Sequence, residues 1–190
     1  MERAALFAKR IHVDFMDGKF APTKSPGLLQ AWWPEKIHID LHVMHENPEK
    51  ELDEIVGLKP QLVIVHAEAG GNFVIIANRL HEAGIRAGVA LLPKTPVDVI
   101  KPALEHADHV LIFSGDLGHF GGDANLELLK KVARAKELKP NLEIGWDGGI
   151  NDTNVKQLIA AGVDVLNVGG YIQRAENAKE RYNILENLVH

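Results

Sequence analysis

Apolar and polar residues alternate with a period of two in short runs along the chain. In the first run, Ile11, Val13 and Phe15 alternate with His12, Asp14 and Met16. This alternation predicts a β-strand that packs one face against helices and carries polar groups on the other. Further apolar runs recur downstream, and together they predict seven strands, at residues 10–16, 37–44, 61–67, 86–92, 109–114, 142–146 and 163–168.

Helix-like segments separate these runs. They cover residues 47–57, 71–83, 96–105, 124–138 and 151–161, and Gly84 and Gly162 follow two of them as helix-ending residues. Alternating strands and helices predict right-handed parallel βα units. The turn-rich loops after each strand favour one α/β domain over residues 1–190, a (β/α)8-type TIM barrel, with a flavodoxin-like open sheet as the alternative. Seven strands are one fewer than such a barrel needs for closure.

Polar side chains gather where the predicted strands end. His12 and Asp14 lie on the first strand, His42 on the second, His66 at the end of the third, and Asp147 directly before Gly148-Gly149. In a parallel barrel, all these strand ends meet at one mouth. Two imidazoles and two carboxylates can surround a divalent cation, whereas buried polar groups without a ligand would be costly.

Glycine pairs follow the last three predicted strands, in "GHFGGD", "DGGI" and "VGGY". Such loops let backbone N–H groups point at an anion, and the last third of a TIM barrel is where phosphate is bound. One glycine pair alone would be ordinary turn chemistry. Three pairs together predict a phosphate site. Combined with the histidines and carboxylates at the strand ends, they predict a metal-dependent enzyme that acts on a small phosphorylated substrate.

Composition narrows the classes of partner. The 190 residues carry a net charge of −5 and no basic run, which argues against a nucleic-acid partner. There is no cysteine, so a metal would have to be bound by histidine and carboxylate. No apolar stretch reaches membrane-spanning length and no signal peptide is visible, so we expect no membrane partner and a cytoplasmic location.

Several motifs resemble the ribulose-phosphate 3-epimerase family of the pentose phosphate pathway, whose fold is a ribulose-phosphate-binding TIM barrel. The family's H-x-D-x-M-D-G-x-F is here "HVDFMDGKF", and its D-x-H-x-M followed by N-P is "DLHVMHENP". "HAEA", "GVALLPKTP" and "DGGI" follow in the family's order. The similarity runs from about residue 11 to the C-terminus.

The resemblance implies roles for these residues. His12, Asp14, His42 and Asp147 would ligate one divalent metal ion, commonly Zn, Fe or Mn, and Asp14 and Asp147 would also be the catalytic acid/base pair. The implied substrate-binding residues are His66, Met16, Met44, Gly121, Gly122, Gly148, Gly149, Gly169 and Gly170.

The sequence also departs from the family pattern. The family begins with a strand that reads like I-L-S-A-D, whereas this sequence begins with "MERAALFAKR". We therefore expect the family's first strand and its serine to be missing. Residues 1–9 are expected to form a helical segment against an imperfectly closed barrel. Gly170 stands where the family usually has serine in the last phosphate loop, and "FSGDLGHFGGD" and "APTKSPG" differ from the family's loops.

These observations leave several functions open. The first is a metal-dependent isomerase that interconverts D-ribulose 5-phosphate and D-xylulose 5-phosphate through an enediolate. The second is an epimerase of another ketose phosphate, such as allulose 6-phosphate, and the third is a non-catalytic barrel remnant that binds metal or phosphosugar. Trp32-Trp33 favours a homo-oligomer interface over ordinary core packing.

Overall fold

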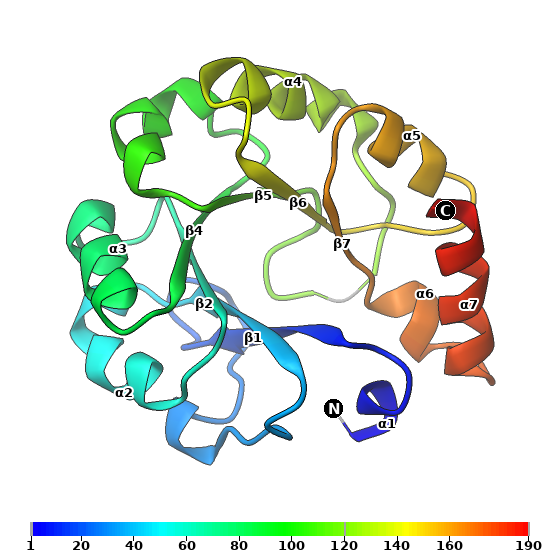
Figure 1. Cartoon of the computed structure of the whole chain (residues 1–190), viewed down its shortest axis with the longest axis horizontal. Helices are drawn as coiled ribbons and strands as arrows, with labels where there is room; N and C mark the ends of the chain where they lie inside the picture. The colour runs from blue at the N-terminus through cyan, green and yellow to red at the C-terminus, as the bar shows by residue number, and fades with distance from the viewer. Residues whose placement is uncertain (1, 120, 190) are drawn as a thin grey trace.

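Seven parallel strands form one sheet whose spatial order is the order of the sequence. The computed structural model describes residues 2–119 and 121–189. The strands are β1 (Arg10–Met16), β2 (His38–Met44), β3 (Leu62–His66), β4 (Arg86–Leu91), β5 (His109–Phe113), β6 (Glu143–Asp147) and β7 (Val165–Asn167). The sheet curls into a nearly closed ring with helices on its outside, which confirms the predicted TIM-type barrel and its seven strands (Figure 1).

Helical segments connect the strands and cover the outer face of the sheet (Figure 1). They are α1 (Glu2–Ala5), η1 (Leu28–Gln30), η2 (Pro48–Glu51), α2 (Leu52–Gly57), α3 (Phe73–Glu82), η3 (Val97–His106), η4 (Leu126–Leu128), α4 (Leu129–Leu138), α5 (Val155–Ala160), α6 (Gly170–Gln173) and α7 (Ala178–Val189). Gly84 and Gly162 end their helices with positive φ, as expected. The segment after β4 is a 3-10 helix and not an α-helix, and Pro102 within it cannot donate an i→i−4 hydrogen bond.

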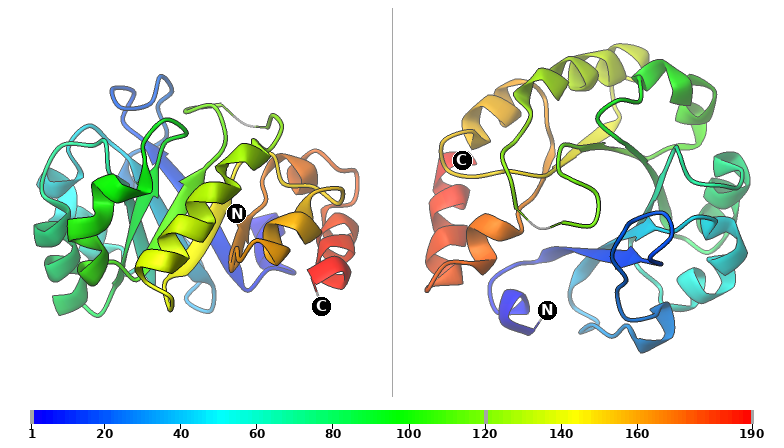
Figure 2. Two further views of the ribbon diagram at one scale, coloured as in Figure 1. Left: turned by 90° about the horizontal axis from the view of Figure 1, so that it is seen from above. Right: turned by 180° about the vertical axis from the view of Figure 1, so that it is seen from behind.

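The ring is open between its first and last strands, a gap that we call the seam. β1 pairs only with β2, and β7 pairs only with β6, among the residues that the structure describes. As predicted, the N-terminal segment is helical. Phe7, which follows α1, packs on Tyr182 of α7 with ring centroids 5.2 Å apart. Figure 2 shows α1 beside the seam from behind, and shows that the long loops after β1 and β5 project from the same end of the barrel.

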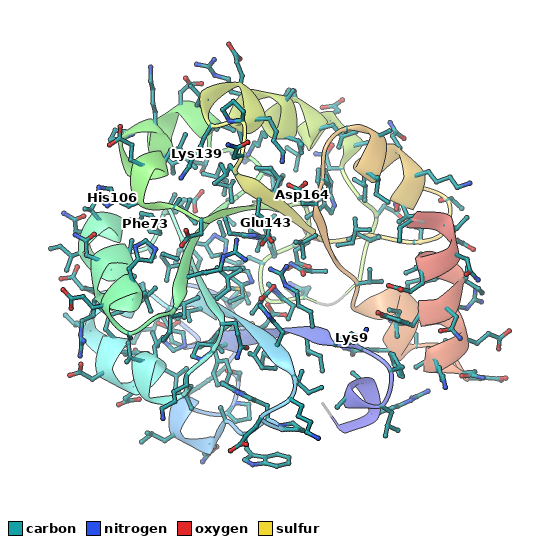
Figure 3. All side chains as sticks on the ribbon, viewed as in Figure 1. Lys9, Phe73, His106, Lys139, Glu143 and Asp164 are labelled. Carbon is teal, nitrogen blue, oxygen red and sulfur yellow. The ribbon has the colours of Figure 1, made fainter. Side chains whose placement is uncertain are left out.

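The side chains of each strand divide between two environments. Alternate residues such as Leu41, Val63 and Trp146 are buried between the sheet and the helices. The residues between them point into the barrel. Many of these are polar, as the alternation of apolar and polar residues along the strands predicted. Figure 3 shows Glu143 near the centre of the ring, while His106 and Lys139 lie in the outer layer. Within residues 2–119 and 121–189, no helix has the length and apolar character needed to cross a bilayer.

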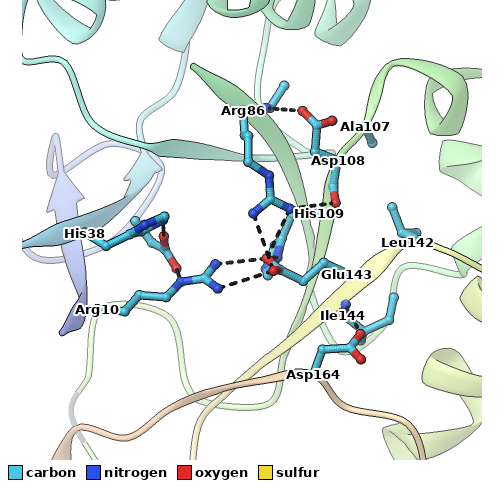
Figure 4. A network of polar contacts seen from close by, with 12 residues as sticks. Arg10, His38, Arg86, Ala107, Asp108, His109, Leu142, Glu143, Ile144 and Asp164 are labelled. Atoms are coloured by element: carbon cyan, nitrogen blue, oxygen red, sulfur yellow. Dashed lines mark hydrogen bonds and ion pairs between the residues drawn. The ribbon is translucent and has the colours of Figure 1, made fainter. Parts of the chain in front are cut away.

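A layer of charged residues fills the barrel at the N-terminal ends of the strands (Figure 4). Arg10 of β1 is its centre: Nε donates to Asp40 at 2.7 Å, and Nη2 donates to Glu143 of β6 at 2.9 Å. His109 Nδ1 also lies 2.8 Å from Glu143. We call Arg10, Asp40, Arg86, His109 and Glu143 the basal layer. The Arg10–Glu143 pair spans the seam, since it joins the first strand to the sixth without passing through the sheet.

Loss of the Arg10 guanidinium should loosen the seam. Arg10→Met keeps most of the length of the side chain but removes the arginine partner of Asp40, and it leaves Glu143 with the longer contact to Arg86 at 3.3 Å. Because these groups are mostly buried, we expect the free energy of unfolding to fall by about 2–3 kcal/mol, measured by urea denaturation. The matched control is Arg134→Met, which removes an exposed pair with Asp98 on the outside of the barrel. It should change the stability much less than Arg10→Met does, because water and salt screen an exposed ion pair.

The pH dependence of stability provides a second readout of the same variant. Burial raises the pKa of Glu143, but hydrogen bonds from His109 and Arg10 outweigh it and hold the pKa well below its usual range. A carboxyl of this kind stabilises the fold above its unfolded-state pKa of about 4.3 and loses that contribution as the pH falls. Arg10→Met should therefore lose less stability than the wild type as the pH falls from about 5 to about 3. An equal decrease in the free energy of unfolding in Arg10→Met and Arg134→Met would contradict the proposed role of Arg10 in bridging the seam.

Candidate active site

Four predicted residues meet at the C-terminal mouth of the barrel. His12 and Asp14 come from β1, His42 from β2 and Asp147 from β6, and one ligand atom of each lies within 4.8 Å of all the others. Asp14 is in register with His42 on the neighbouring strand, which places the two side chains at one level. Asp147 reaches the same point from across the seam, where its Oδ2 lies 3.9 Å from His12 Nε2.

The spacing of these atoms fits a divalent cation. Four ligands about 2.1 Å from a tetrahedral ion lie about 3.4 Å from one another. His12 Nε2 lies 3.3 Å from His42 Nδ1 and 3.2 Å from Asp14 Oδ1, and His42 Nδ1 lies 3.0 Å from Asp14 Oδ1. Two imidazole nitrogens and two carboxylate oxygens are also the donor set that Zn, Fe and Mn accept.

The electrostatics of the cluster also favour a positive charge at its centre. Burial alone would lower the pKa of His12, but the hydrogen bond to Asp14 and the charges of Asp14 and Asp147 raise it to about 9. Burial lowers the pKa of His42 to about 3. One imidazole is therefore held protonated among the carboxylates, and the other is held neutral.

The two carboxylates differ from each other in their pKa values. Burial would raise the pKa of Asp14, but the hydrogen bond from His12 and the charge of His12 hold it well below its usual range. Burial and the negative charge of Asp14 raise the pKa of Asp147 to about 7. Two carboxyl groups at one site therefore favour opposite protonation states, which is the arrangement that an acid/base pair requires.

A second layer of polar residues lies behind His42. His42 Nε2 is 2.9 Å from His66 Nε2, His66 Nδ1 is 3.3 Å from Glu68, and the Leu92 N–H donates to the same carboxylate. Glu68 can only accept, so the His66 proton lies on Nδ1 and His66 Nε2 accepts from His42 Nε2–H. His42 Nδ1 is then left with its lone pair toward the cluster. The H-x-E alternation at residues 66–68 was the sequence signal for this role of Glu68, which sequence analysis left unassigned.

A cavity of about 1000 Å³ extends from the cluster of candidate metal ligands to the glycine loops and along the seam. Most predicted substrate-binding residues line it, namely Met16, Met44, Gly121, Gly122, Gly148, Gly149, Gly169 and Gly170. His66 is not on this wall, because it is buried behind His42. His12, Asp14 and Asp147 also reach the cavity, so three of the four candidate ligands face the space in which a substrate would lie, while His42 is buried behind them.

Two features of the cavity were not predicted. Asn167, at the end of β7, is buried beside Asp147, and its Nδ2 has no hydrogen-bond partner among the described residues. Nothing in the short run 163–168 indicated that the Asn167 side chain would face the cavity and not the core. The close packing of loops also went unseen: a Cβ on Gly149 would lie 2.0 Å from the Ala124 nitrogen. Glycine is therefore required there by the approach of the preceding loop as well as by its φ of 73°.

Comparisons with known proteins identify the family of the chain. The family profile described as the ribulose-phosphate 3 epimerase family matches residues 3–173. The chain is 34% identical to ribulose-phosphate 3-epimerase of Schizosaccharomyces pombe, and the match covers 94% of this chain and 81% of that protein. It is 35% identical to ribulose-phosphate 3-epimerase of Helicobacter pylori, with 94% and 85% covered.

Among solved structures, a 3-hexulose-6-phosphate synthase superimposes with a TM-score of 0.73 and 15% identity, covering 100% of this chain and 91% of the other. Phosphoribosyl anthranilate isomerase of Thermus thermophilus superimposes with a TM-score of 0.67 and 15% identity, covering 98% and 92%. At these identities the similarity concerns the fold, which is the TIM barrel. The profile match and the curated relatives extend over nearly all of the sequence, and the chain therefore belongs to the ribulose-phosphate 3-epimerase family of isomerases.

Proposed function

We propose that this protein is a divalent-metal-dependent 3-epimerase that interconverts D-ribulose 5-phosphate and D-xylulose 5-phosphate. The observation that carries the proposal is the pair of carboxylates, Asp14 and Asp147, which face one cavity beside two imidazoles. The names of the curated relatives support ribulose phosphate as the substrate. The proposal places the protein in carbohydrate metabolism, as an enzyme of the pentose phosphate pathway in the cytoplasm.

Epimerisation at C3 requires removal of a proton from a carbon next to the C2 ketone. This carbon acid is too weak for a carboxylate in water, so the negative charge that develops on the enediolate oxygens must be stabilised. A Zn, Fe or Mn ion held by His12, Asp14, His42 and Asp147 would supply that positive charge when bound. His66 and Glu68 support this arrangement through His42.

Inversion requires that the proton leaves one face of C3 and returns to the other. Asp14 and Asp147 reach the cavity from β1, the first strand of the sheet, and β6, the last strand but one, which lie on the two sides of the seam. One carboxylate takes the proton, the other acid delivers a proton, and the roles exchange in the reverse direction. The opposite pKa shifts of the two groups support this division of roles.

The glycine loops provide the remaining recognition. The glycine pairs 121–122, 148–149 and 169–170 line the cavity, and their backbone N–H groups would hold the phosphate of the substrate. Met16 and Met44 pack together near Phe20 and Leu117, and they would form an apolar wall over the sugar carbons. The volume of about 1000 Å³ also leaves room for a longer ketose phosphate such as allulose 6-phosphate, which is the second candidate substrate.

An activity assay on metal-loaded protein tests the proposal directly. We expect the protein loaded with Zn, Fe or Mn to convert ribulose 5-phosphate to xylulose 5-phosphate, with metal analysis giving one ion per chain. Activity on allulose 6-phosphate alone would assign the second substrate. Metal binding without turnover of either sugar would instead identify a non-catalytic metal- and phosphosugar-binding barrel. Gel filtration of the same sample decides between a monomer and the expected homo-oligomer.

A further inference from the structure

An arginine side chain lies directly on the glycine loops of the cavity. Arg174 directly follows α6, the short helix that begins at Gly170, and it lines the same cavity as the three glycine pairs. We infer that the Arg174 guanidinium is a phosphate-binding group of this protein and sets its preference for phosphorylated ketoses. This inference rests on the proposed function, since that function supplies the phosphate ester as the ligand.

The position of the guanidinium is set by close contact with Gly121. A Cβ on Gly121 would lie 2.5 Å from Arg174 Nη2 and 3.1 Å from Cζ. Any other residue at position 121 would therefore push the guanidinium away, and the φ of 94° at Gly121 also disfavours a side chain. Glycine at this position keeps the arginine head against the backbone of the loop.

The same head group is also next to the following loop. A Cβ on Gly170 would lie 3.5 Å from the Gly121 α-carbon and 3.9 Å from Arg174 Cζ. The guanidinium therefore lies where the loops after β5 and β7 meet. Arg174 and the glycine pairs of these loops line one cavity, and both a guanidinium N–H and a backbone N–H can only donate a hydrogen bond.

A group of donors with one fixed positive charge suits a phosphate monoester. A guanidinium presents paired N–H groups that match two phosphate oxygens, and it keeps its charge at every physiological pH. Backbone amides alone bind phosphate without a full charge. Arg174 would add that charge at the end of the cavity remote from the sugar carbons that react.

Two other arginines near the seam, Arg181 and Arg3, contact groups outside the glycine pairs. Arg181 of α7 donates to the Tyr171 hydroxyl at 3.0 Å and lies over the Tyr171 ring at 5.0 Å. Arg3 donates to the carbonyl oxygens of Ala175 and Glu176. Arg181 therefore provides a matched control: it has the same charge and lines the same cavity, but its head group contacts the hydroxyl and the ring of Tyr171, whereas the Arg174 head group lies against Gly121.

The test compares Arg174→Gln, Arg174→Lys and the control Arg181→Gln, each loaded with metal. Loss of a charge-assisted contact should raise KM for ribulose 5-phosphate by about tenfold to a hundredfold in Arg174→Gln. kcat/KM for unphosphorylated D-ribulose should stay within about twofold of the wild type, since that sugar makes no phosphate contact. Arg174→Lys should fall between the wild type and Arg174→Gln, because lysine keeps the charge but loses the paired donors.

Binding of inorganic phosphate, measured by calorimetry on the metal-free protein, separates this inference from the proposed function. The dissociation constant should rise about tenfold or more in Arg174→Gln and stay unchanged in Arg181→Gln, whether or not the protein is an epimerase. Equal affinity for phosphate in the wild type and Arg174→Gln would overturn the inference and leave the epimerase proposal intact. No measurable phosphate binding by the wild type, or an equal loss in both Gln variants, would also overturn it.

Discussion

Replacement of Asp147 by asparagine is expected to abolish epimerisation while the protein stays folded. An amide keeps the shape of the side chain but cannot take or return the C3 proton, so kcat should fall by about 10³-fold or more. The pKa of Asp147 is already raised to about 7, so a neutral group at this buried position is compatible with the fold. Circular dichroism and urea denaturation would establish folding, and a coupled assay of xylulose 5-phosphate would give the rate.

The matched variants make the role of the carboxylate specific. Asp14→Asn should show the same loss, because both faces of C3 need a group that exchanges a proton. Asp152→Asn, in the exposed loop after β6, should keep wild-type activity. The wild-type enzyme should also introduce solvent deuterium at C3 of the product. Near-normal turnover in either active-site variant, or product without deuterium, would exclude the two-carboxylate scheme.

Metal binding is expected to stabilise the whole barrel as well as to activate it. The candidate ligands come from β1, β2 and β6, so an ion bound to them would join the two sides of the seam. Free metal at about 100 times its dissociation constant should add about 2.7 kcal/mol to the free energy of unfolding, and raise the melting temperature by about 5–10 °C. Thermal denaturation with and without Zn²⁺, Mn²⁺ or a chelator measures this shift.

Hydrogen exchange would show where the stabilisation acts. Amides of β1 and β7, the two strands at the seam, should gain the most protection when metal is added, because these strands lack a partner on one side. Asp14→Asn should lose most of the thermal shift, whereas Asp152→Asn should keep it. An equal shift in both variants would mean that the ion binds elsewhere.

The alternating pattern predicted much of the fold and of the cluster, for an identifiable physical reason. In a parallel barrel the C-terminal ends of all strands meet at one mouth. His12, Asp14 and Asp147 could therefore be placed together without knowledge of distances. Contacts that depend on register and loop packing could not be predicted in this way. The Arg10–Glu143 pair requires the curvature of the sheet, and the approach of Ala124 to Gly149 requires the path of a loop.

The last two helices were missed for another reason. α6 has four residues and no buried side chain, and in α7 only Ala178 and Leu185 are buried, so neither helix has a strong apolar stripe. Without that periodicity, sequence reasoning has little to detect. The position of Arg174 depends on α6 and on the loop after β5, and it therefore could not be predicted from the sequence either.

The unpaired seam gives this barrel the topology of a linear repeat array. Each strand pairs with the next one in the sequence, and within residues 2–119 and 121–189 no strand pair joins the two ends. Nearest-neighbour contacts of this kind allow folding to start within the array and spread toward both ends, as in solenoid proteins. The long-range contacts that convert the array into a ring are side-chain contacts such as Arg10–Glu143 and His12–Asp147. Ring formation should then be a late, separable step in folding, and residues of the active site would take part in it.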